Sequence, residues 1–199
     1  MDNKTFVILT HDFALYCSDR HELLTGVYEF NVFAKHLEKQ ALNLHKDNMK
    51  KRDKYVGDGF ELFCEMLHKG FPFDKRLGIS NYQLAETDAE GVDGFGVGVN
   101  GRPATSQQKY RGDPTLELAT KDFHLFPFIS QNNYGVKLED TDNMLVITAG
   151  KDIYRRSKEI LGGKVRCVGR EDIRNMVDNH LPFWDSFRLS WEMVVEKLK

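Results

Sequence analysis

Three side chains that suit metal-assisted chemistry lie on a stretch that the sequence predicts to be a β-hairpin. The glycine-rich segment 92–99 alternates like a strand, Asn100-Gly101 is a strong signal for a two-residue turn, and residues 104–110 form the returning strand. Residues two apart share one face of a strand, so Gln107 and Lys109 point the same way. With a two-residue turn, paired residue numbers sum to about 201, which places Asp93 opposite residue 108. The sequence therefore predicts that a carboxylate, an amide and an ammonium group meet here.

This trio suits the hydrolysis of a phosphodiester bond with the help of magnesium. Mg²⁺ prefers hard oxygen ligands and keeps several waters, so one carboxylate and one or two other oxygens are enough to hold it. The ion polarises a phosphoryl oxygen and acidifies a bound water, and a nearby lysine neutralises charge in the transition state. The amide oxygen of Gln107 is a weaker ligand than a carboxylate, so we expect a lowered affinity for the metal.

The elements around the hairpin predict an α/β fold. Residues 143–148 form a continuous apolar strand of the buried kind, and residues 164–168 form a second strand. Helices are expected over 116–128, ending at Pro127, and over 151–161 and 170–180. A strand, a helix and a second strand at this length imply a parallel, right-handed crossover. Together with the hairpin, these elements predict a mixed central sheet flanked by helices.

The chain before the hairpin is expected to be helical. The first fifty residues have apolar side chains at helical spacing. A short helix is expected to open at Gly57-Asp58-Gly59 and to end at Gly70-Phe71-Pro72. Its apolar stripe contains Phe60, and Glu61 and Glu65 lie one turn apart at the border of that stripe.

These motifs resemble those of the PD-(D/E)XK nuclease superfamily, in the Mrr-like restriction endonuclease branch and in the variant with glutamine before the lysine. The matching segments are the Gly-x-x-Phe-Glu helix at 57–61, the Asp hairpin at 92–96 and the Gln107-Gln108-Lys109-Tyr110 strand. The later strand–helix–strand–helix stretch resembles the tail of that core, so the likeness covers about residues 54–180. We therefore expect a helical N-terminal extension over 1–53 and a restriction-endonuclease-like core with a helical tail over 54–199. Val92 stands where that family has a proline.

The resemblance implies a role for each site residue. Asp93 would bind the metal directly, Gln107 would supply a second ligand, and Lys109 would be the catalytic lysine. Glu61 would reach the metal through water or assist as a base. The implied activity is a metal-dependent DNA endonuclease of the restriction or homing type, using Mg²⁺ with Mn²⁺ as a substitute. Many relatives act as homodimers, because cutting both strands needs two sites.

Two alternatives of other classes stay open from the sequence. Because Gln107 leaves fewer carboxylates, the first is a catalytically inactive DNA-binding module of the same fold. The second is a structural subunit whose N-terminal helices recruit a partner. Cleavage of plasmid DNA separates the enzyme from the binding module, and the absence of salt-dependent DNA affinity would favour the structural subunit.

Composition bounds the remaining classes. The chain has 199 residues, is 41% hydrophobic and contains only 5 prolines, so it can bury a proper core. Its 3 cysteines give neither a disulfide framework nor zinc-ligand spacing, and no apolar run approaches the roughly 18 residues that span a bilayer. The N-terminus does not read as a signal peptide. We therefore expect a cytoplasmic protein that does not span a membrane; binding to DNA is what the resemblance implies.

Charge is uneven along the chain although the formal net charge is only −2. Segments 35–54 and 151–175 are basic, and segment 55–95 is acidic. The first basic segment is equally well read as a solvated helix face or as an arm that contacts phosphates. An acidic segment flanked by basic ones is what we expect where a metal site lies beside the phosphate backbone of a nucleic acid.

Some other patterns have structural explanations. His11-Asp12 is expected to mark a helix start, and the aromatic residues of 183–191 to lie in the core or at a dimer contact. Glycines at 94, 96 and 98 lack the ending of a nucleotide loop, so we expect them to allow a close backbone approach or a sharp twist. Glu86, Asp88 and Glu90 are expected in a solvated loop.

Overall fold

The structure is a computed structural model, which describes residues 8–16, 20–85, 91–160 and 165–196. The chain forms two compact units, which are described separately below. The helical unit consists of Met1–Met66 and Ile173–Lys199, and the sheet unit consists of Leu67–Asp172. The division therefore falls near the end of a long helix, whereas the sequence had suggested one between residues 53 and 54. No described helix is long and apolar enough to cross a membrane.

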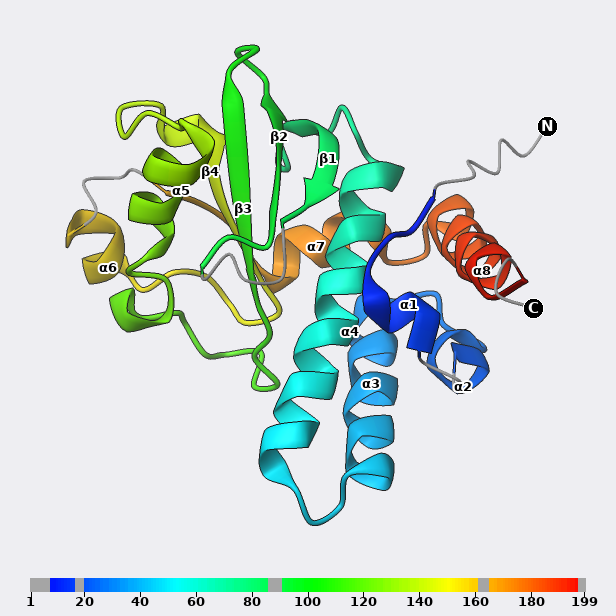
Figure 1. Cartoon of the computed structure of the whole chain (residues 1–199). Coiled ribbons are helices and arrows are strands. Elements are labelled where there is room, and N and C mark those ends of the chain that lie inside the picture. Colours follow the sequence, from blue (N-terminus) through cyan, green and yellow to red (C-terminus); the bar gives the residue numbers. More distant parts are fainter. Residues whose placement is uncertain (1–7, 17–19, 86–90, 161–164, 197–199) are drawn as a thin grey trace. The chain divides into compact units, whose positions relative to one another are not determined.

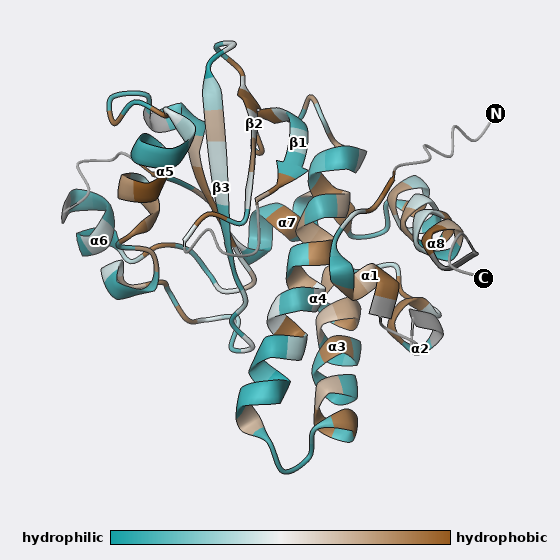
Figure 2. Ribbon diagram, viewed as in Figure 1, coloured by the Kyte–Doolittle hydropathy of each residue, from teal (hydrophilic) through white to brown (hydrophobic). Residues whose placement is uncertain are grey.

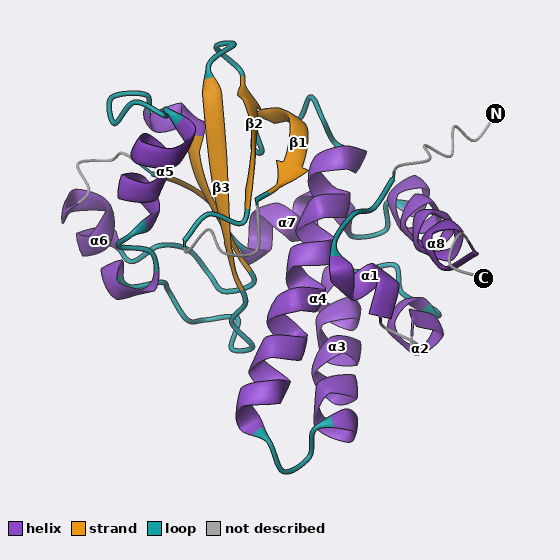
Figure 3. Ribbon diagram, viewed as in Figure 1, coloured by secondary structure: helices purple, strands orange, loops and turns teal. Residues whose placement is uncertain are grey.

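The sheet unit is built around a five-stranded mixed sheet (Figures 1 and 3). Its strands, in spatial as well as chain order, are β1 (Ile79–Leu84), β2 (Gly94–Gly98), β3 (Pro103–Lys109), β4 (Met144–Thr148) and β5 (Arg166–Val168). The first three strands pair antiparallel, and β3, β4 and β5 pair parallel. Its helices include α5 (Phe126–Tyr134) and α6 (Arg155–Ile160), with the short 3-10 turns η1 (Thr120–Asp122) and η2 (Thr141–Asn143). The prediction of a mixed sheet flanked by helices is confirmed.

The apolar run of β4 explains its place inside the sheet. All five residues of this strand are buried, and it pairs on both sides with parallel neighbours, as such runs do. A core cluster lies beside it, formed by Val92, Leu118, Phe123, Phe126, Val136, Met144, Val146, Ile153 and Val165. This packing holds β3, the strand of Gln107 and Lys109, on the other side of β4 from β5.

The strand β1 was not predicted from the sequence. Its residues are mostly polar, with a burial pattern that does not alternate regularly. The pairing of β1 with β2 shifts between Ser80 and Gln83, and Asn81 within it has a positive φ of 51°. This bulge interrupts the period of two, which is the signal that identifies a strand in a sequence.

The helix expected over residues 116–128 is placed wrongly by the sequence analysis. α5 begins at Phe126, with Pro127 in its first turn, and ends at Tyr134; Gly135 caps it in the left-handed conformation, with φ 68°. A proline is tolerated in the first turn because its missing N–H would have no partner there. Pro127 therefore marks the start of this helix, not its end.

The helical unit contains α1 (Asp12–Tyr16), α2 (Arg20–Leu24), α3 (Phe30–Leu44), most of α4 (Met49–Gly70), most of α7 (Arg170–Val177) and α8 (Leu181–Glu196). Aromatic side chains fill its core: Phe33, Phe63, Trp184, Phe187 and Trp191 are all at most 1% exposed. The core reading of the aromatic residues of 183–191 is thus confirmed. The indole N–H of Trp191 also donates to the carbonyl of Ala14, which ties α8 to α1.

α4 begins two turns earlier than expected. Its first turn is capped by Asn48, whose side-chain oxygen accepts the N–H of Lys51 at 3.0 Å. The predicted start at Gly57-Asp58-Gly59 is therefore wrong, although the predicted end at Gly70 is confirmed. A Cβ on Gly59 would lie 2.4 Å from Leu37 Cδ1, so this glycine serves the close packing of α4 on α3.

Candidate active site

The β2–β3 hairpin is present, but its turn and register differ by one residue from the prediction. Gly94 pairs with Ser106 and Phe95 with Thr105, whereas a two-residue turn would pair Gly94 with Gln107. The connection is a three-residue loop closed by a bond of 2.8 Å from the N–H of Gly98 to the carbonyl of Arg102. Gly101 takes the left-handed conformation in it, with φ 75°. Such a loop is the next most common hairpin connection, and its extra residue shifts every pair.

Asp93 lies just before β2 and is fixed against β3. Its N–H donates to the carbonyl of Ser106 at 2.9 Å. Its carboxylate accepts the main-chain N–H of Gln108 at 2.5 Å. The side chain is half-buried. The N–H of Gln108 belongs to the peptide bond between Gln107 and Gln108, so the carboxylate of Asp93 lies beside that peptide bond.

Gln107 is the unusual member of the predicted set. Its side chain is only 3% exposed, and its amide oxygen is buried without a hydrogen-bond partner among the residues that the structure describes. Its Nε2 lies 3.7 Å from the position of a Cβ on Gly91, and the main-chain nitrogen of Phe126, the first residue of α5, lies 3.6 Å from that same position. A buried oxygen without a partner costs free energy on folding, which a bound ligand would offset; the amide oxygen of Gln108 is in the same state.

Lys109 ends β3 two residues beyond Gln107. The side chain is half-buried, and no ion pair with another described residue is found for it. Its main chain is held by Thr148, whose hydroxyl donates to the carbonyl of Lys109 at 2.8 Å. Thr105, two residues before Gln107, donates its hydroxyl to Ser130 Oγ at 2.8 Å, so this face of β3 lies toward α5. Sequence reasoning did not identify Ser130 or Thr148, because their partners come from distant elements.

Glu61 belongs to the helical unit, whereas Asp93, Gln107 and Lys109 belong to the sheet unit. Its carboxylate lies 3.1 Å from Nε2 of His11. Nδ1 of His11 accepts the N–H of Phe13 at 3.1 Å, so Nε2 carries the proton that is donated to Glu61. His11 thereby caps α1, which begins at Asp12, and the predicted helix start is confirmed.

Glu65, one turn after Glu61, has a structural role. It is fully buried, and its carboxylate accepts bonds from the N–H and the hydroxyl of Thr10 and from the N–H of His11. These bonds hold the segment before α1 against α4 within the helical unit. The two glutamates on one helix face therefore have different partners, and Glu61 is the more exposed of the two, with 33% of its side chain accessible.

The charges of the acidic segment 55–95 and of the second basic segment, 151–175, are mostly used inside the described part of the chain. Asp58 pairs with Lys54, and Arg76, which bonds Asp74, lowers the pKa of that carboxyl. In segment 151–175, ion pairs join Lys151 to Glu117, Arg155 to Glu159, Lys158 to Asp152 and Arg174 to Asp178. Arg166 instead donates to the carbonyls of Lys75, Arg76, Leu77 and Asp142. This segment therefore offers fewer cations to a phosphate than its sequence suggested. Glu86, Asp88 and Glu90 lie outside the described residues.

The glycines of β2 serve internal packing. A Cβ on Gly94 would lie 2.2 Å from the hydroxyl of Tyr82, one on Gly96 2.4 Å from the carbonyl of Ser80, and one on Gly98 2.3 Å from Oδ1 of Asn143. Every one of these positions is closer than atoms can approach. The glycines thus allow neighbouring elements to lie close to β2, which is the kind of close approach that the sequence analysis considered, here with partners inside the chain.

Within the described ranges, no three histidine, cysteine, aspartate or glutamate side chains are grouped so that they could hold a metal ion. The two ligands predicted on the hairpin, Asp93 and Gln107, offer one carboxylate and one amide oxygen. A carboxylate and an amide oxygen that converge on one ion can hold Mg²⁺ with several retained waters, but not a dehydrated ion.

Comparisons with known proteins add no homologue. No protein family model matches the chain, and no curated protein or solved structure is significantly similar to it.

Proposed function

We propose that this chain is a metal-dependent DNA endonuclease whose site lies on the β2–β3 hairpin. The observation that carries the proposal is the buried amide oxygen of Gln107, which has no described partner, on a residue whose peptide bond to Gln108 holds the carboxylate of Asp93. The order of elements around them, a hairpin followed by α5 and the parallel strands β4 and β5, supports the resemblance to PD-(D/E)XK nucleases.

The donor set fits a magnesium ion with water ligands. Asp93 has one carboxylate oxygen in a bond to Gln108, and a carboxylate oxygen has lone pairs for more than one partner. Gln107 supplies a neutral oxygen that is already desolvated, so binding costs it no water. When bound there, Mg²⁺ or Mn²⁺ would polarise the phosphoryl group and lower the pKa of a water.

The protein residues have the remaining roles. A water oxygen forms a new bond to phosphorus while the bond from phosphorus to one sugar oxygen breaks, and a proton from the water ends on the leaving oxygen. One water is consumed, and a phosphate monoester and an alcohol are produced. The Lys109 ammonium would neutralise the charge that develops on the phosphoryl oxygens. The N–H of Gln108 keeps the Asp93 carboxylate in place. Glu61 is proposed as an assisting carboxylate, on the resemblance alone.

Nicking of supercoiled plasmid in the presence of Mg²⁺ or Mn²⁺ tests the proposal. Asp93→Asn keeps an oxygen that can accept the Gln108 N–H, so the hairpin should stay folded while cleavage falls by at least about 100-fold. Lys109→Ala should have a similar effect. Asp113→Asn and Lys121→Ala are the matched controls, since both residues are exposed in the same unit. Wild-type activity in purified Asp93→Asn or Lys109→Ala protein would remove these residues from the site.

One observation favours the second candidate, a DNA-binding module of the same fold without activity. The hairpin brings one carboxylate, that of Asp93, next to Gln107, where an active site with Glu at this position would have two. Such a module would shift plasmid DNA in a gel without nicking it at any Mg²⁺ or Mn²⁺ concentration. Light scattering of the purified protein tests the accompanying expectation of a homodimer.

A further inference from the structure

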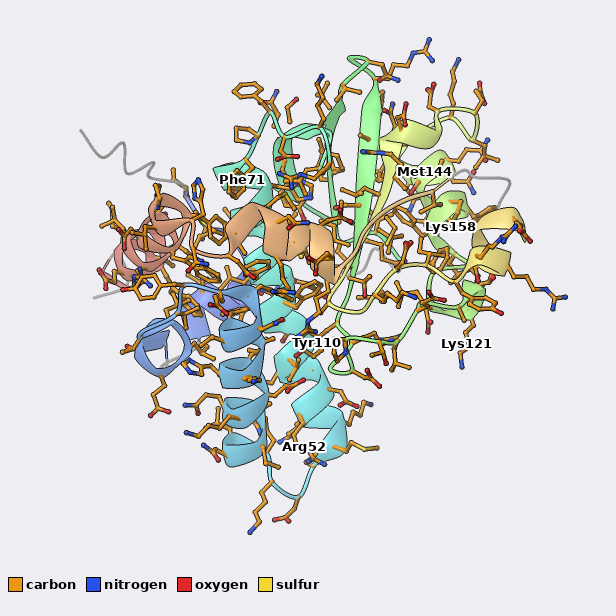
Figure 4. The ribbon with its side chains drawn as sticks, turned by 180° about the vertical axis from the view of Figure 1, so that it is seen from behind. Arg52, Phe71, Tyr110, Lys121, Met144 and Lys158 are labelled. Carbon is orange, nitrogen blue, oxygen red and sulfur yellow. The ribbon has the colours of Figure 1, made fainter. Side chains whose placement is uncertain are left out.

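The hairpin formed by α3 and α4 carries a group of basic side chains at its turn. Lys46, Lys50 and Lys51, called here the turn lysines, are exposed, and none forms an ion pair with another residue in the part of the chain that the structure describes. Arg52 follows them, and its Nε is buried without a hydrogen-bond partner among the described residues. Figure 4 labels Arg52 near the end of α4 that adjoins this turn, and Figure 2 shows that end of α4 as mostly hydrophilic.

Cations elsewhere in the described chain are used differently. Other lysines and arginines of the described chain form ion pairs with carboxylates: Lys54, Arg76, Arg102, Arg111, Lys151, Arg155, Lys158, Arg174 and Arg188. Exposed lysines without such a pair also occur in the sheet unit, at 75, 121 and 137, but each lies on a different element. The gathering of unpaired cations within one turn and one helix end is therefore a feature of the α3–α4 hairpin.

This arrangement is unfavourable for the isolated chain. Lys50 and Lys51 lie in the first turn of α4, which contains no acidic residue, and cations there are opposed by the helix dipole by a few tenths of a kcal/mol each. Lys46 lies just before this turn, and the acidic neighbours of the three lysines in the sequence are Asp47 and Asp53. A polyanion that supplies an acceptor to each ammonium group and to the Arg52 guanidinium would offset this cost.

We propose that the turn of the α3–α4 hairpin binds the phosphate backbone of duplex DNA. The proposal rests on the proposed function only for the identity of the polyanion, and it adds a second DNA-binding surface, in the helical unit. Its contacts would be with phosphates, so they would add affinity without reading sequence.

An anionic bilayer is the competing partner, because Leu42, Leu44 and Met49 are exposed near the turn. Helices that lie on membranes present a continuous apolar face opposite their lysines. The apolar face of α4 is instead buried in the core of the helical unit, where Val56, Phe60 and Phe63 are at most 8% exposed. That leaves a bilayer only the few apolar side chains at the turn, and we therefore favour DNA.

The test compares two triple variants of the full-length chain in EDTA, so that no metal is available for cleavage. Lys46→Gln/Lys50→Gln/Lys51→Gln removes the turn lysines, and Lys75→Gln/Lys121→Gln/Lys137→Gln removes three exposed lysines of the sheet unit. Fluorescence anisotropy with a labelled duplex measures affinity over a series of KCl concentrations. The turn variant should lower the slope of log K against log salt by about 0.9 for each lost contact, or up to about 2.7, while the control changes it by less than about 0.9.

Two results would overturn the proposal: equal changes of slope in both variants, or unchanged DNA binding together with lost binding to phosphatidylserine vesicles. Nicking of plasmid by the wild-type chain is measured separately, with Mg²⁺. It shows whether the hairpin proposal, the proposed nuclease function or both have failed. A chain that never nicks but shows the slope difference keeps the hairpin proposal, and a chain that nicks without the slope difference keeps only the nuclease.

Discussion

Two neighbouring glutamines on opposite faces of β3 differ in the hydrogen bonds of their side chains. On one face, the side-chain amide of Gln108 donates to the hydroxyl of Tyr82 at 3.2 Å and to Ser106 Oγ at 2.9 Å. The ring of Tyr82 in turn stacks on His68, with centroids 4.1 Å apart and planes 7° from parallel. On the other face, the side chain of Gln107 makes no hydrogen bond with any described residue.

The two residues do not differ in burial, because Gln107 is 3% and Gln108 4% exposed. Each also has a buried amide oxygen without a partner in the described part of the chain. The difference lies in the donors: Gln108 is anchored by two bonds to packed neighbours, and Gln107 is not. The comparison teaches that a buried glutamine stabilises a sheet where its amide group is bonded; under the proposed function, a ligand would supply the bond that Gln107 lacks.

The largest expected contrast is between Gln107→Leu and Gln108→Leu. Gln107→Leu should lower plasmid nicking by about 100-fold and leave the free energy of unfolding unchanged or raised by up to about 1 kcal/mol, because an unbonded buried amide is removed. Gln108→Leu should lower that free energy by about 1–3 kcal/mol, because Tyr82 and Ser106 lose their donor. Urea unfolding followed by circular dichroism measures both, beside the nicking assay. Equal destabilisation by the two substitutions would mean that the side chains of Gln107 and Gln108 contribute equally to stability, contrary to the comparison.

Gln107→Glu sharpens the comparison through metal binding. A carboxylate is a stronger ligand for a hard cation, so the affinity for Mn²⁺, measured by isothermal titration calorimetry, should rise by about tenfold or more. Without metal, this variant should be less stable than the wild type, since a buried carboxylate lacks compensation. Gln108→Glu is the control, and it should destabilise the chain without raising Mn²⁺ affinity. A gain in affinity at position 108 but not at 107 would place the metal on the wrong face for the proposed site.

The Gln108 face also predicts a dependence of stability on pH. Burial, with a smaller contribution from Arg166, lowers the pKa of His68 to about 3 from the usual 6.5. Between these values the unfolded chain binds more protons than the folded one, so stability falls as the pH drops below 6.5, by up to about 1.4 kcal/mol per unit. His68→Phe should reduce this slope in urea titrations between pH 4 and 6.5, roughly the range of the shift. His124→Gln, at an exposed position, should leave it unchanged.

The sequence predicted the hairpin, the parallel strands and the helical N-terminal region because each has a local signal. The apolar run of β4 and the glycine of the turn are examples, and both are present. The exact pairing could not be predicted, because Asn100-Gly101 fits both a two-residue turn and the three-residue loop that forms. The hydrogen-bond partner of Asp93 could not be predicted either, since it is a main-chain N–H whose position depends on that register. The missing partner of Gln107 is a property of tertiary packing and has no signature in the sequence.

The smallest expected effect concerns the hydroxyl that anchors Gln108. Tyr82→Phe keeps the ring that stacks on His68 and removes the hydroxyl that accepts the 3.2 Å bond from Gln108. It should lower the free energy of unfolding by about 1 kcal/mol, the usual net worth of one such bond. In Gln108→Leu protein the same substitution should cost less, because the donor is already absent, and a double-mutant cycle measures the difference. Additive effects of the two substitutions would show that Tyr82 does not anchor Gln108, and the contrast between the faces of β3 would then rest on Ser106 alone.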